Sequence, residues 1–449
     1  MKTDVLVIGS SAAGLVVPTV GKRVNPDKKF TVVTRQPKTM IPCGIPYIFG
    51  SLSGSDNNIL PAEKMYEQTG VEIIHDEIVS ISREDKTVEL ANGEKIEFEK
   101  LVFGTGSLPY KPKWLNWEGK DNVFFVPKDK VYLDDMKEKL SGCKKIVTIG
   151  AGFIGVEMSD ELNKAGKKVT LIEKLPNILG LAFDKDISER IEVILKERGV
   201  EILTNAEVKE ITGESKVEGV KLGDGTEIKA DAVIISMGYK PNTELAQKAG
   251  ILVNEMGFIR VDEYMRTCDK DIFAVGDCAE KRDFVTGKQV PVMLASTACA
   301  EARIAGMNLF KLSAIKTFSG TISIFSTAIG DNGFGVAGMT EAQAISEGFD
   351  IITGVAEGMD RHPGGLSGMH KQYVKLVVAK ESGVILGGAV LGGLSAGELI
   401  NVIGVAIQNR MNVNSLFITQ IGTHPLLTAS PAAYPLIKAV ENAIIQLNK

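Results

Sequence analysis

Short runs of hydrophobic residues without alternation, most of them leading into a glycine, recur along the chain. A run of this kind is typical of a strand that is buried on both faces, as in a parallel sheet covered by helices. The runs cover residues 4–8, 30–33, 101–103, 145–149, 168–172, 232–236 and 271–275. The pattern therefore predicts an α/β protein built on parallel sheets.

Apolar and polar residues alternate elsewhere. Residues 71–102 alternate in this way, which predicts antiparallel strands with a hairpin turn at Asn92-Gly93. From about residue 316 the chain changes character and combines alternation with helical periodicity. We expect strands at 371–378 and 384–391 and helices at 396–410 and 432–447. These segments predict a separate C-terminal α+β unit. Because this unit has apolar faces and contains no nucleotide-binding pattern, we expect it to act in dimerisation.

The first hydrophobic run leads into a nucleotide-binding pattern, Gly9-Ser10-Ser11-Ala12-Ala13-Gly14. In this G-x-x-x-x-G loop, Ser11 stands at the usual place of the middle glycine. A strand, a glycine turn and a helix in this order aim backbone N–H groups at a pyrophosphate. Thr34 ends the next strand, where an acid that binds ribose hydroxyls is expected. From this single pattern, a dinucleotide site and an ordinary Gly-rich turn remain equally open.

A second and complete pattern is Gly150-Ala151-Gly152-Phe153-Ile154-Gly155, which matches G-x-G-x-x-G. The strand that follows its helix ends in Glu173, about 20 residues beyond the glycines, as a dinucleotide site requires. A carboxylate there accepts hydrogen bonds from both ribose hydroxyls and repels a 2′-phosphate. The pattern therefore predicts NADH as the nicotinamide cofactor, in preference to NADPH.

Length and composition narrow the class of protein. A chain of 449 residues is too long for one hydrophobic core, so we expect about two to four domains. The net charge of -5 gives no attraction to nucleic acid or an anionic membrane. The scattered cysteines contain no C-x-x-C pair, which argues against disulfides and a metal site and favours a cytoplasmic location. Residues 1–20 superficially resemble a signal peptide, but Asp4 and the glycine spacing favour strand, loop and helix.

One cysteine has an unusual context, because Cys43 lies between Pro42 and Pro46. Each proline fixes its own φ and biases the residue before it toward extended geometry, which predicts a fixed, non-helical path. From this segment alone, a packed core thiol and a nucleophile facing a cofactor are equally open. Asp277 follows a buried strand, where a carboxylate binds a ligand hydroxyl or caps the helix expected near Ala295.

Together, the two nucleotide patterns, the cysteine behind the first and the C-terminal unit resemble the flavin-dependent pyridine nucleotide-disulfide oxidoreductases. The resemblance covers essentially the whole chain and includes Thr105-Gly106, Gly238 with Pro241-Asn242, and Gly276-Asp277. It implies two Rossmann-like three-layer domains and a C-terminal α+β dimerisation domain, and hence a homodimer. The implied boundaries are 1–112 and 243–318 for the FAD-binding domain, 113–242 for the NAD-binding domain and 319–449 for the dimerisation domain.

The resemblance also implies the roles of individual residues. Asp277 would bond the ribitol chain of FAD, and Glu157 would lie near the contact between flavin and nicotinamide. The implied cofactor-binding residues are Gly9, Ser11, Ala12, Ala13, Gly14, Thr34, Arg35, Thr105, Gly106, Gly276, Asp277, Gly150, Gly152, Phe153, Ile154, Gly155, Glu157, Glu173 and Gly238. Thr34 departs from the acid that the family usually has at this position.

The lack of a C-x-x-x-x-C pair places the resemblance in the single-cysteine branch, which includes coenzyme A-disulfide reductases, sulfur or persulfide reductases, and NADH oxidases and peroxidases. The oxidases and peroxidases have a histidine where this chain has Ala12, which argues against oxygen or peroxide as the main acceptor. The coenzyme A contacts carried over from the family are Arg23, Thr39 and Arg303. His362 and His424 stand where coenzyme A-disulfide reductases have tyrosines, and Ala429 replaces the glutamate of the two-cysteine enzymes.

The expected reaction passes electrons from NADH through FAD to Cys43 and then to a disulfide or persulfide, with coenzyme A disulfide, coenzyme A persulfide or polysulfide as substrate. We expect Cys43 to be a thiolate with a lowered pKa. His424 of the partner subunit would protonate the leaving thiolate. Two alternatives remain open: an NADH oxidase that cycles Cys43 through a sulfenic acid, and a flavin-bound redox sensor with little turnover.

Overall fold

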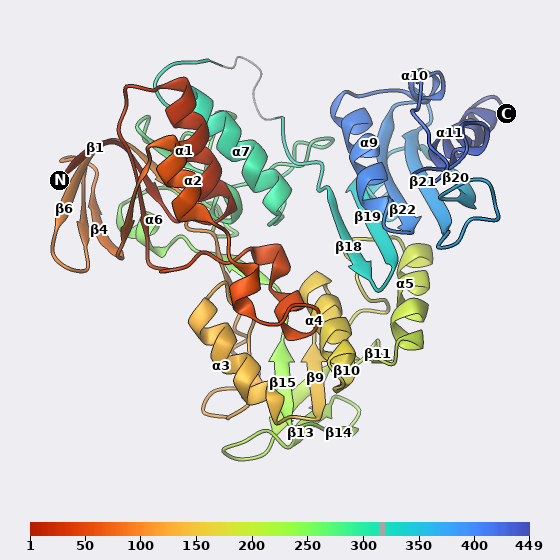
Figure 1. Cartoon of the computed structure of the whole chain (residues 1–449), viewed down its shortest axis with the longest axis horizontal. Helices are drawn as coiled ribbons and strands as arrows, with labels where there is room; N and C mark the ends of the chain where they lie inside the picture. The colour runs from red at the N-terminus through yellow and green to blue at the C-terminus, as the bar shows by residue number, and fades with distance from the viewer. Residues whose placement is uncertain (314–318) are drawn as a thin grey trace. The chain divides into compact units, whose positions relative to one another are not determined.

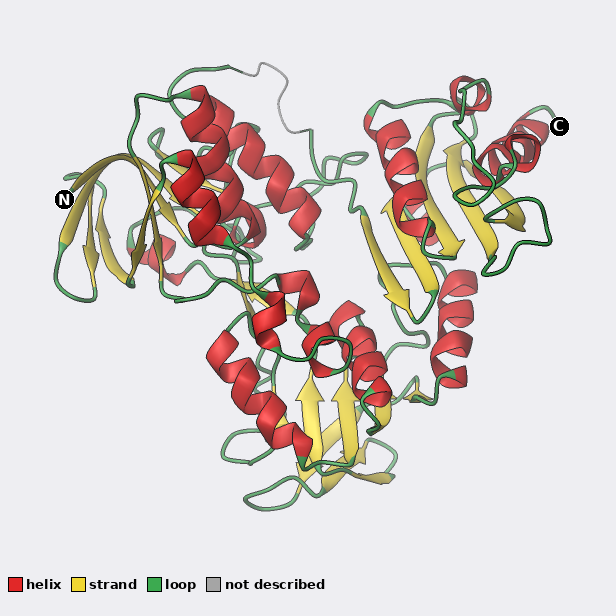
Figure 2. Cartoon of the chain, viewed as in Figure 1, coloured by secondary structure: helices red, strands yellow, loops and turns green. Residues whose placement is uncertain are grey.

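The computed structural model describes residues 1–313 and 319–449, and the chain forms two compact units (Figure 1). The first unit comprises residues 1–172, 206–282 and 289–319, and the second comprises residues 173–205, 283–288 and 320–449. The predicted domain boundary at residue 318 lies outside the described residues. Helices pack against β-sheets in both units (Figure 2), and no helix among the described residues is long and apolar enough to cross a membrane.

The first sheet of the first unit has the strand order β3-β2-β1-β6-β5-β4, and β17 pairs with β6. Its strands are β1 (Lys2–Ile8), β2 (Phe30–Thr34), β3 (Glu72–His75), β4 (Ile78–Ser82), β5 (Thr87–Leu90), β6 (Lys95–Phe103) and β17 (Ile272–Ala274). Strands β1, β2, β3 and β17 pair in parallel, which confirms the predicted buried runs. The hairpin at Asn92-Gly93 is confirmed between β5 and β6, but β3 is parallel to β2 and not antiparallel as expected.

Strand β6 combines both directions of pairing. Its first half alternates between exposed and buried residues and pairs antiparallel with β5. Its last three residues are all buried and pair in parallel with both β1 and β17. One strand therefore pairs antiparallel with β5 and in parallel with β1 and β17, so alternation along it does not decide the direction of pairing.

Helices α1 (Ala12–Val24), α2 (Ala62–Thr69) and α7 (Ala295–Asn308) share one hydrophobic core with this sheet. Helices α1 and α7 lie side by side (Figure 1), and glycines allow their close approach. A Cβ atom at Gly306 on α7 would lie 2.9 Å from the carbonyl oxygen of Val17 and 3.2 Å from the backbone nitrogen of Gly21, both on α1. The start of α7 near Ala295 confirms the expected helix.

The second parallel sheet of the first unit contains β10, β9, β15 and β8 in this order. These strands are β8 (Val123–Phe124), β9 (Lys145–Ile149), β10 (Lys168–Ile172) and β15 (Ala232–Ile235), with helices α3 (Lys130–Ser141) and α4 (Phe153–Lys164). The smaller elements of this unit are β7 (Ser107–Pro109), β12 (Val208–Thr212), β13 (Gly219–Leu222), β14 (Glu227–Lys229), β16 (Tyr239–Pro241) and α6 (Glu244–Lys248). Strands β7 and β16 pair antiparallel and thereby join the segments that follow Thr105-Gly106 and Gly238.

The second unit is built on a five-stranded antiparallel sheet with the order β18-β19-β22-β21-β20. Its strands are β18 (Phe325–Ile329), β19 (Asn332–Gly338), β20 (Ile351–Met359), β21 (Lys371–Ala379) and β22 (Ile385–Gly392). Its helices are α5 (Lys185–Glu197), α8 (Glu341–Ser346), α9 (Ala396–Gln408), α10 (Val413–Phe417) and α11 (Pro435–Leu447). Helices α9 and α11 share one hydrophobic core with the sheet. The predicted α+β unit is confirmed, including both expected strands and both expected helices.

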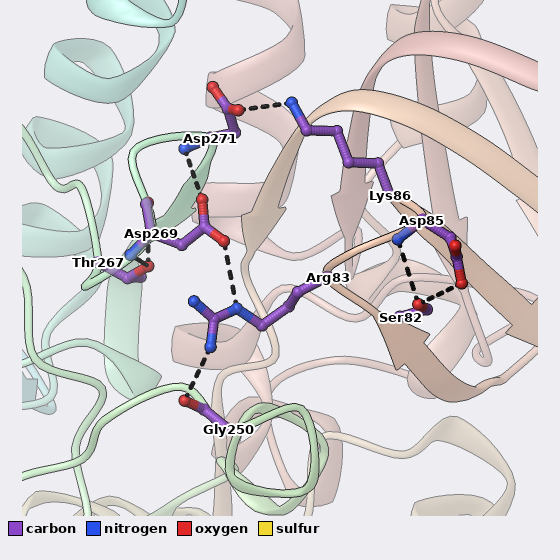
Figure 3. Close-up of polar contacts among 8 residues, drawn as sticks. All are labelled: Ser82, Arg83, Asp85, Lys86, Gly250, Thr267, Asp269 and Asp271. Atoms are coloured by element: carbon purple, nitrogen blue, oxygen red, sulfur yellow. Dashed lines mark hydrogen bonds and ion pairs between the residues drawn. The ribbon is translucent and has the colours of Figure 1, made fainter.

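A polar cluster fixes the strand that leads to Asp277 (Figure 3). The Asp271 carboxylate forms ion pairs with Lys86 Nζ and Lys100 Nζ, each at 2.5 Å, and only 12% of its side chain is exposed. Asp269 accepts hydrogen bonds from the Asp271 backbone N–H at 3.0 Å and from Arg83 Nε at 3.2 Å. The turn between β4 and β5 is therefore fastened to the segment that enters β17.

Candidate functional site

Cys43 lies in a short 3₁₀ helix, Pro42–Gly44, which is followed by a second one, Pro46–Phe49. The predicted non-helical path is wrong: the Gly44 N–H donates to the Ile41 carbonyl and the Ile45 N–H to the Pro42 carbonyl. Ile41 is extended as expected, but Ile45 is helical, with φ −59° and ψ −47°. Proline is tolerated at the first helical position because its missing N–H would be unpaired there in any case.

The segment around Cys43 is held from two directions. Asn58 donates its side-chain amide to the Ile41 carbonyl at 3.0 Å, and a Cβ atom at Gly44 would collide with that amide at 1.9 Å. Downstream, Glu161 on helix α4 accepts the Ser51 hydroxyl at 2.8 Å and the Ser51 N–H at 2.5 Å. Helix α4, which follows the second glycine loop, therefore positions the turn that presents Cys43.

Cys43 is accessible to solvent, as is Cys268, whereas Cys143 and Cys278 are buried and Cys299 is intermediate. Partial burial raises the pKa of the Cys43 thiol, the charges of Glu157 and Asp277 raise it further, and the charge of Lys128 lowers it. The expectation of a lowered pKa is therefore wrong for the protein groups alone. Partial desolvation and the two carboxylates outweigh Lys128 and the backbone hydrogen bond, which both lower the pKa.

The side chain of Asp277 is held by two residues that the sequence patterns did not indicate. Asp277 lies in the short 3₁₀ helix η4 (Gly276–Cys278) that follows β17. Its Oδ2 accepts hydrogen bonds from Lys128 Nζ at 2.7 Å and from Ser107 Oγ at 2.8 Å. Burial alone would raise the pKa of Asp277, but Lys128 and Ser107 hold it below its ordinary value. Asp277 is therefore a carboxylate, ready to accept a ligand hydroxyl.

The first glycine loop fits the pyrophosphate of FAD. Gly9 has φ +101°, and a Cβ atom there would lie 2.4 Å from the Gly104 carbonyl oxygen. A Cβ atom at Gly14 would lie 2.0 Å from the Gly9 carbonyl oxygen. Helix α1 begins directly after Ser11, whose hydroxyl does not cap it, and Ala12 and Ala13 occupy its first turn. Small residues thus leave the N-terminus of α1 unobstructed, as phosphate binding requires.

Thr34 and Thr39 meet beside this loop. Ser10 Oγ donates to Thr34 Oγ1 at 3.0 Å and lies 2.6 Å from Thr39 Oγ1. Thr34 is buried at the end of β2, so it offers a hydroxyl where the family has an acid. Arg35 is exposed and pairs with Glu77 at 3.5 Å. Thr39, predicted as a coenzyme A contact, therefore lies beside the first glycine loop.

The second glycine loop has the same packing and fits NAD(H). Gly150 has φ +96°, and a Cβ atom at Gly155 would lie 1.9 Å from the Gly150 carbonyl oxygen. Gly152 faces open space, since a Cβ atom there would have no neighbour within 4 Å. Phe153 and Ile154 begin helix α4, which also carries Glu157. Glu173 directly follows β10, and its Oε1 accepts the Leu175 N–H at 2.8 Å.

The two family glycines outside the loops also lie at turns. Gly106 has φ +68° and Gly238 has φ +90°, and a Cβ atom at either position would have no neighbour within 4 Å. Thr105 Oγ1 donates to the Asn242 carbonyl at 2.6 Å, and the Asn242 N–H donates to the Gly106 carbonyl at 2.9 Å. Gly276, beside Asp277, has φ +74° and would place a Cβ atom 3.2 Å from Ala13. The structure thus brings Gly276 next to the first glycine loop.

The two arginines predicted to contact coenzyme A lie on neighbouring helices. Arg23 is in the last turn of α1 and Arg303 is on α7, and both are exposed. Because α1 and α7 pack side by side, both cations lie on the same helical layer. Arg303 acts on Cys299: burial raises the pKa of that thiol and the charge of Arg303 lowers it.

The two histidines of interest lie in the second unit on adjoining loops. The His362 N–H donates to the Pro425 carbonyl at 3.3 Å, and His362 Nδ1 lies 3.0 Å from the Thr428 carbonyl oxygen. His424 is exposed, and its Nδ1 accepts the Leu426 N–H at 3.3 Å. Its proton therefore resides on Nε2 when the ring is neutral.

Comparison with known proteins gives consistent matches over nearly the whole chain. The family model for pyridine nucleotide-disulphide oxidoreductases matches residues 3–302, and the model for their dimerisation domain matches residues 324–433. The NAD(P)H coenzyme A polysulfide/persulfide reductase of Pyrococcus horikoshii is 33% identical and covers 87% of this chain and 88% of its own. An NADH oxidase of Methanocaldococcus jannaschii is 29% identical over 99% of each chain.

Solved structures give the same result. The NAD-dependent persulfide reductase from A. fulgidus has a TM-score of 0.91 at 30% identity and covers 100% of this chain and 84% of that chain. The water-forming NADH oxidase from Lactobacillus brevis has a TM-score of 0.88 at 25% identity over 99% of each chain. These similarities confirm the family resemblance and the predicted fold class, with two Rossmann-like nucleotide-binding folds and a C-terminal α+β dimerisation domain.

Proposed function

Because this chain belongs to the pyridine nucleotide-disulphide oxidoreductases, we propose that it reduces a persulfide or disulfide at Cys43 with electrons from NADH. The family is an oxidoreductase family that uses FAD and NAD(P)H. The observation that carries the proposal is the placement of Cys43: the residue is accessible to solvent, and Asp277 and Glu157, one from each nucleotide-binding fold, both act on the charge of its partly buried thiol. A packed core thiol such as Cys143 is not accessible to solvent.

The described residues supply a place for both cofactors. The loop from Gly9 to Gly14, Thr105-Gly106 and Asp277 would hold FAD, and the loop from Gly150 to Gly155 would hold NADH. Glu173 supports NADH over NADPH, because a carboxylate at the end of β10 repels a 2′-phosphate. FAD, when bound, supplies the two-electron link between NADH and sulfur, so that NADH, a proton and R–S–S–R′ yield NAD⁺, R–SH and R′–SH.

The sulfur chemistry belongs to the chain itself. The Cys43 thiolate attacks one sulfur of R–S–S–R′, a bond forms between Cys43 Sγ and that sulfur, and R′–S⁻ leaves with the electron pair of the broken bond. The leaving thiolate needs a proton, which His424 Nε2 of the partner subunit in a homodimer would donate. With a persulfide as substrate, the sulfur that leaves or remains is released as hydrogen sulfide after reduction.

We propose coenzyme A disulfide or coenzyme A persulfide as the substrate, with polysulfide as a further acceptor. Support comes from the exposed cations Arg23 and Arg303 on neighbouring helices, which suit phosphate groups. Thr39 completes the proposed contacts, although its hydroxyl is already engaged by Ser10. We propose also that the protein is a homodimer located in the cytoplasm.

NADH oxidation by oxygen is the second candidate function, and full-length similarity to a protein of that name favours it. In that reaction Cys43 would cycle through a sulfenic acid. The residue that argues against it is Ala12, in the place of the histidine of oxidases and peroxidases. A redox sensor with little turnover would differ from both enzymes, since it would consume about one NADH per site and then stop.

An anaerobic screen of acceptors tests the proposal. Purified holoenzyme is supplied with NADH and, separately, with coenzyme A disulfide, coenzyme A persulfide, inorganic polysulfide, a quinone or, in air, oxygen. Steady NADH consumption with a sulfur acceptor, at a rate well above that with oxygen, is the expected result. A rate that is highest with oxygen would favour the oxidase, and a single turnover with every acceptor would favour the sensor.

A further inference from the structure

The segment that follows Cys43 lies directly against helix α4 (Figure 1). A Cβ atom at Gly50 would lie 2.4 Å from the Glu161 carbonyl oxygen and 2.6 Å from Glu161 Oε2. Gly50 has φ −142°, outside the left-handed region, so a glycine is needed here for space. The segment therefore approaches α4 more closely than a side chain at residue 50 permits.

The next residue, Ser51, is bound by both oxygens of the Glu161 carboxylate. Its N–H donates to Oε2 at 2.5 Å, and its hydroxyl donates to Oε1 at 2.8 Å. The direction of the second bond is fixed, because Lys164 Nζ can only donate and lies 2.8 Å from the same hydroxyl oxygen. Only 4% of Glu161 is exposed. Hydrogen bonds to a carboxylate are strong, so this buried contact holds Ser51 firmly.

The contact at Ser51 reaches Cys43 through a series of turns. Each turn is linked to its neighbours by backbone hydrogen bonds: from the Ile45 N–H to the Pro42 carbonyl at 3.3 Å, from the Ile48 N–H to the Ile45 carbonyl at 3.2 Å, and from the Leu52 N–H to the Tyr47 carbonyl at 2.7 Å. Ile48 and Phe49 are buried within the series. Residues 42–52 therefore behave as one body, and a shift of Ser51 displaces Cys43.

Helix α4 connects this contact to the second glycine loop. The helix begins with Gly152 as its N-cap, and Glu161 lies about two turns further on. The same helix thus begins at the loop that fits NAD(H) and fastens the turn that presents Cys43.

We propose that Glu161 is a positioning residue for the reaction at Cys43: its carboxylate fixes the Cys43 turn to helix α4 and thereby holds the sulfur at a set place relative to the NAD-binding loop. This inference rests on the proposed function, since it concerns the step in which Cys43 reacts. A misplacement of about 1 Å can slow a reaction about 100-fold, so a fastened turn matters for catalysis without touching the substrate.

Two variants break the contact by different means. Glu161→Ala removes the carboxylate, whereas Gly50→Ala keeps every polar group and adds a methyl group that collides with Glu161. Hydrogen–deuterium exchange of the FAD-bound protein measures the release of the turn. In both variants, peptides within residues 41–52 should exchange about tenfold faster, and peptides from β1 and β9 should not change.

Kinetics then separate positioning from a general loss of structure. With coenzyme A disulfide as acceptor, both variants should lower kcat by about tenfold or more. The KM for the disulfide and the anaerobic bleaching of the flavin by NADH should stay nearly unchanged, because neither depends on the place of the sulfur. Glu161→Gln should recover most of kcat and of the exchange protection, since its amide oxygen still accepts the Ser51 N–H.

Gly54→Ala is the matched control. Gly54 has φ 170°, which is extended backbone, and a Cβ atom there would have no neighbour within 4 Å. This variant should therefore keep both the exchange and kcat of the unaltered protein. Equal results for Gly50→Ala and Gly54→Ala would overturn the inference, as would a turn that is released in Gly50→Ala while kcat stays unchanged.

Ser51→Ala serves if a larger change prevents folding. It removes only the hydroxyl bond to Glu161 and should shift exchange and kcat in the same direction by a smaller factor; no shift in either would overturn the inference. Failure of the proposed function would look different: Cys43→Ser would still reduce disulfides, while the exchange of residues 41–52 would still respond to Gly50→Ala.

Discussion

The ammonium of Lys281 lies 3.2 Å from Glu301 Oε1, and neither side chain is exposed to solvent. Lys281 Nζ also donates to the Gly276 carbonyl at 2.5 Å, and Glu301 Oε2 accepts the Gly276 N–H at 2.8 Å. The pair therefore forms hydrogen bonds with both backbone polar groups of Gly276, the residue that precedes Asp277. Burial raises the pKa of Glu301, and the charge of Lys281 opposes that rise.

We expect Lys281→Met to destabilise the protein strongly, because it leaves Glu301 buried without its counter-charge. Breaking such a pair typically costs about 3–5 kcal/mol. The double variant with Lys281→Met and Glu301→Gln should lose much less stability. Its amide oxygen still accepts the Gly276 N–H, and no charge is left unpaired. Chemical unfolding of the FAD-bound protein measures the free energy of unfolding of both variants. The control is Lys248→Met, which removes an exposed pair with Glu244 and should have a far smaller effect; equal losses for Lys281→Met and Lys248→Met would contradict this account.

Asp271 should make stability depend on pH in the acid range. Burial alone would raise the pKa of Asp271, but hydrogen bonds from Lys100 and Lys86 lower it below the ordinary value of 3.8. A group with a lowered folded-state pKa contributes its stability fully above its unfolded pKa and loses it as the pH falls through the folded one. The stability difference between the unaltered protein and Asp271→Asn should therefore be constant above about pH 5 and shrink below about pH 4. A difference that stays constant down to about pH 3 would show that the cluster in Figure 3 does not act through this charge.

The parts of the fold that local sequence could predict are those in which one segment contains the whole signal. A strand, a glycine loop and a helix follow one another at both nucleotide patterns, so β1, α1, β9 and α4 were all expected. Strand β19 was not, because glycines such as Gly335 weaken a strand pattern and are needed here for close packing against α9. A Cβ atom at Gly335, for example, would lie 2.7 Å from Ile400.

The site was predictable in its motifs and not in its electrostatics. Cys43 and Asp277 could be chosen from sequence, yet the charges that act on them come from distant segments. Lys128 is 149 residues away from Asp277, and a lysine in sequence is ordinarily a solvent-exposed residue. The expected low pKa of Cys43 was wrong for the same reason, since burial and the positions of Glu157 and Asp277 are properties of the folded chain.

Glu173 should set the choice between nicotinamide cofactors. We expect Glu173→Ala to reduce the preference for NADH over NADPH by about tenfold in kcat/KM, because it removes the repulsion of the 2′-phosphate. Glu173→Arg should reduce it further by adding a phosphate-binding cation. Glu197→Ala, which removes an exposed acid from the end of α5, is the control and should keep the preference. Equal use of both cofactors by the unaltered protein would refute the role of Glu173.

His424 should act on the partner's active site. His424→Gln should lower the turnover of a sulfur acceptor about 100-fold through loss of the proton donor, whereas His362→Gln should have a smaller effect because its Nδ1 is already engaged with the Thr428 carbonyl. Mixing Cys43→Ser subunits with His424→Gln subunits tests the contact between subunits. A hybrid dimer then contains one intact pair, so activity should reappear on mixing. No recovery, in mixtures shown to exchange subunits, would assign His424 to its own chain or to no catalytic role.

Cys43→Ser separates the two halves of the proposed reaction. A serine hydroxyl is not ionised at neutral pH and is a far weaker nucleophile for sulfur, so persulfide and disulfide turnover should fall by several orders of magnitude. The substitution removes one sulfur atom from an exposed position, so the FAD content and the anaerobic bleaching by NADH should not change. Cys268→Ser is the matched control, because Cys268 is the other exposed cysteine of the chain and should be dispensable. Mass spectrometry of the untreated protein should find a coenzyme A adduct or an oxidised sulfur at Cys43 and not at Cys268. If Cys43→Ser reduces disulfides at the unaltered rate while Cys268→Ser does not, the wrong exposed thiol has been assigned; if both variants keep full activity, electrons reach the acceptor without a cysteine.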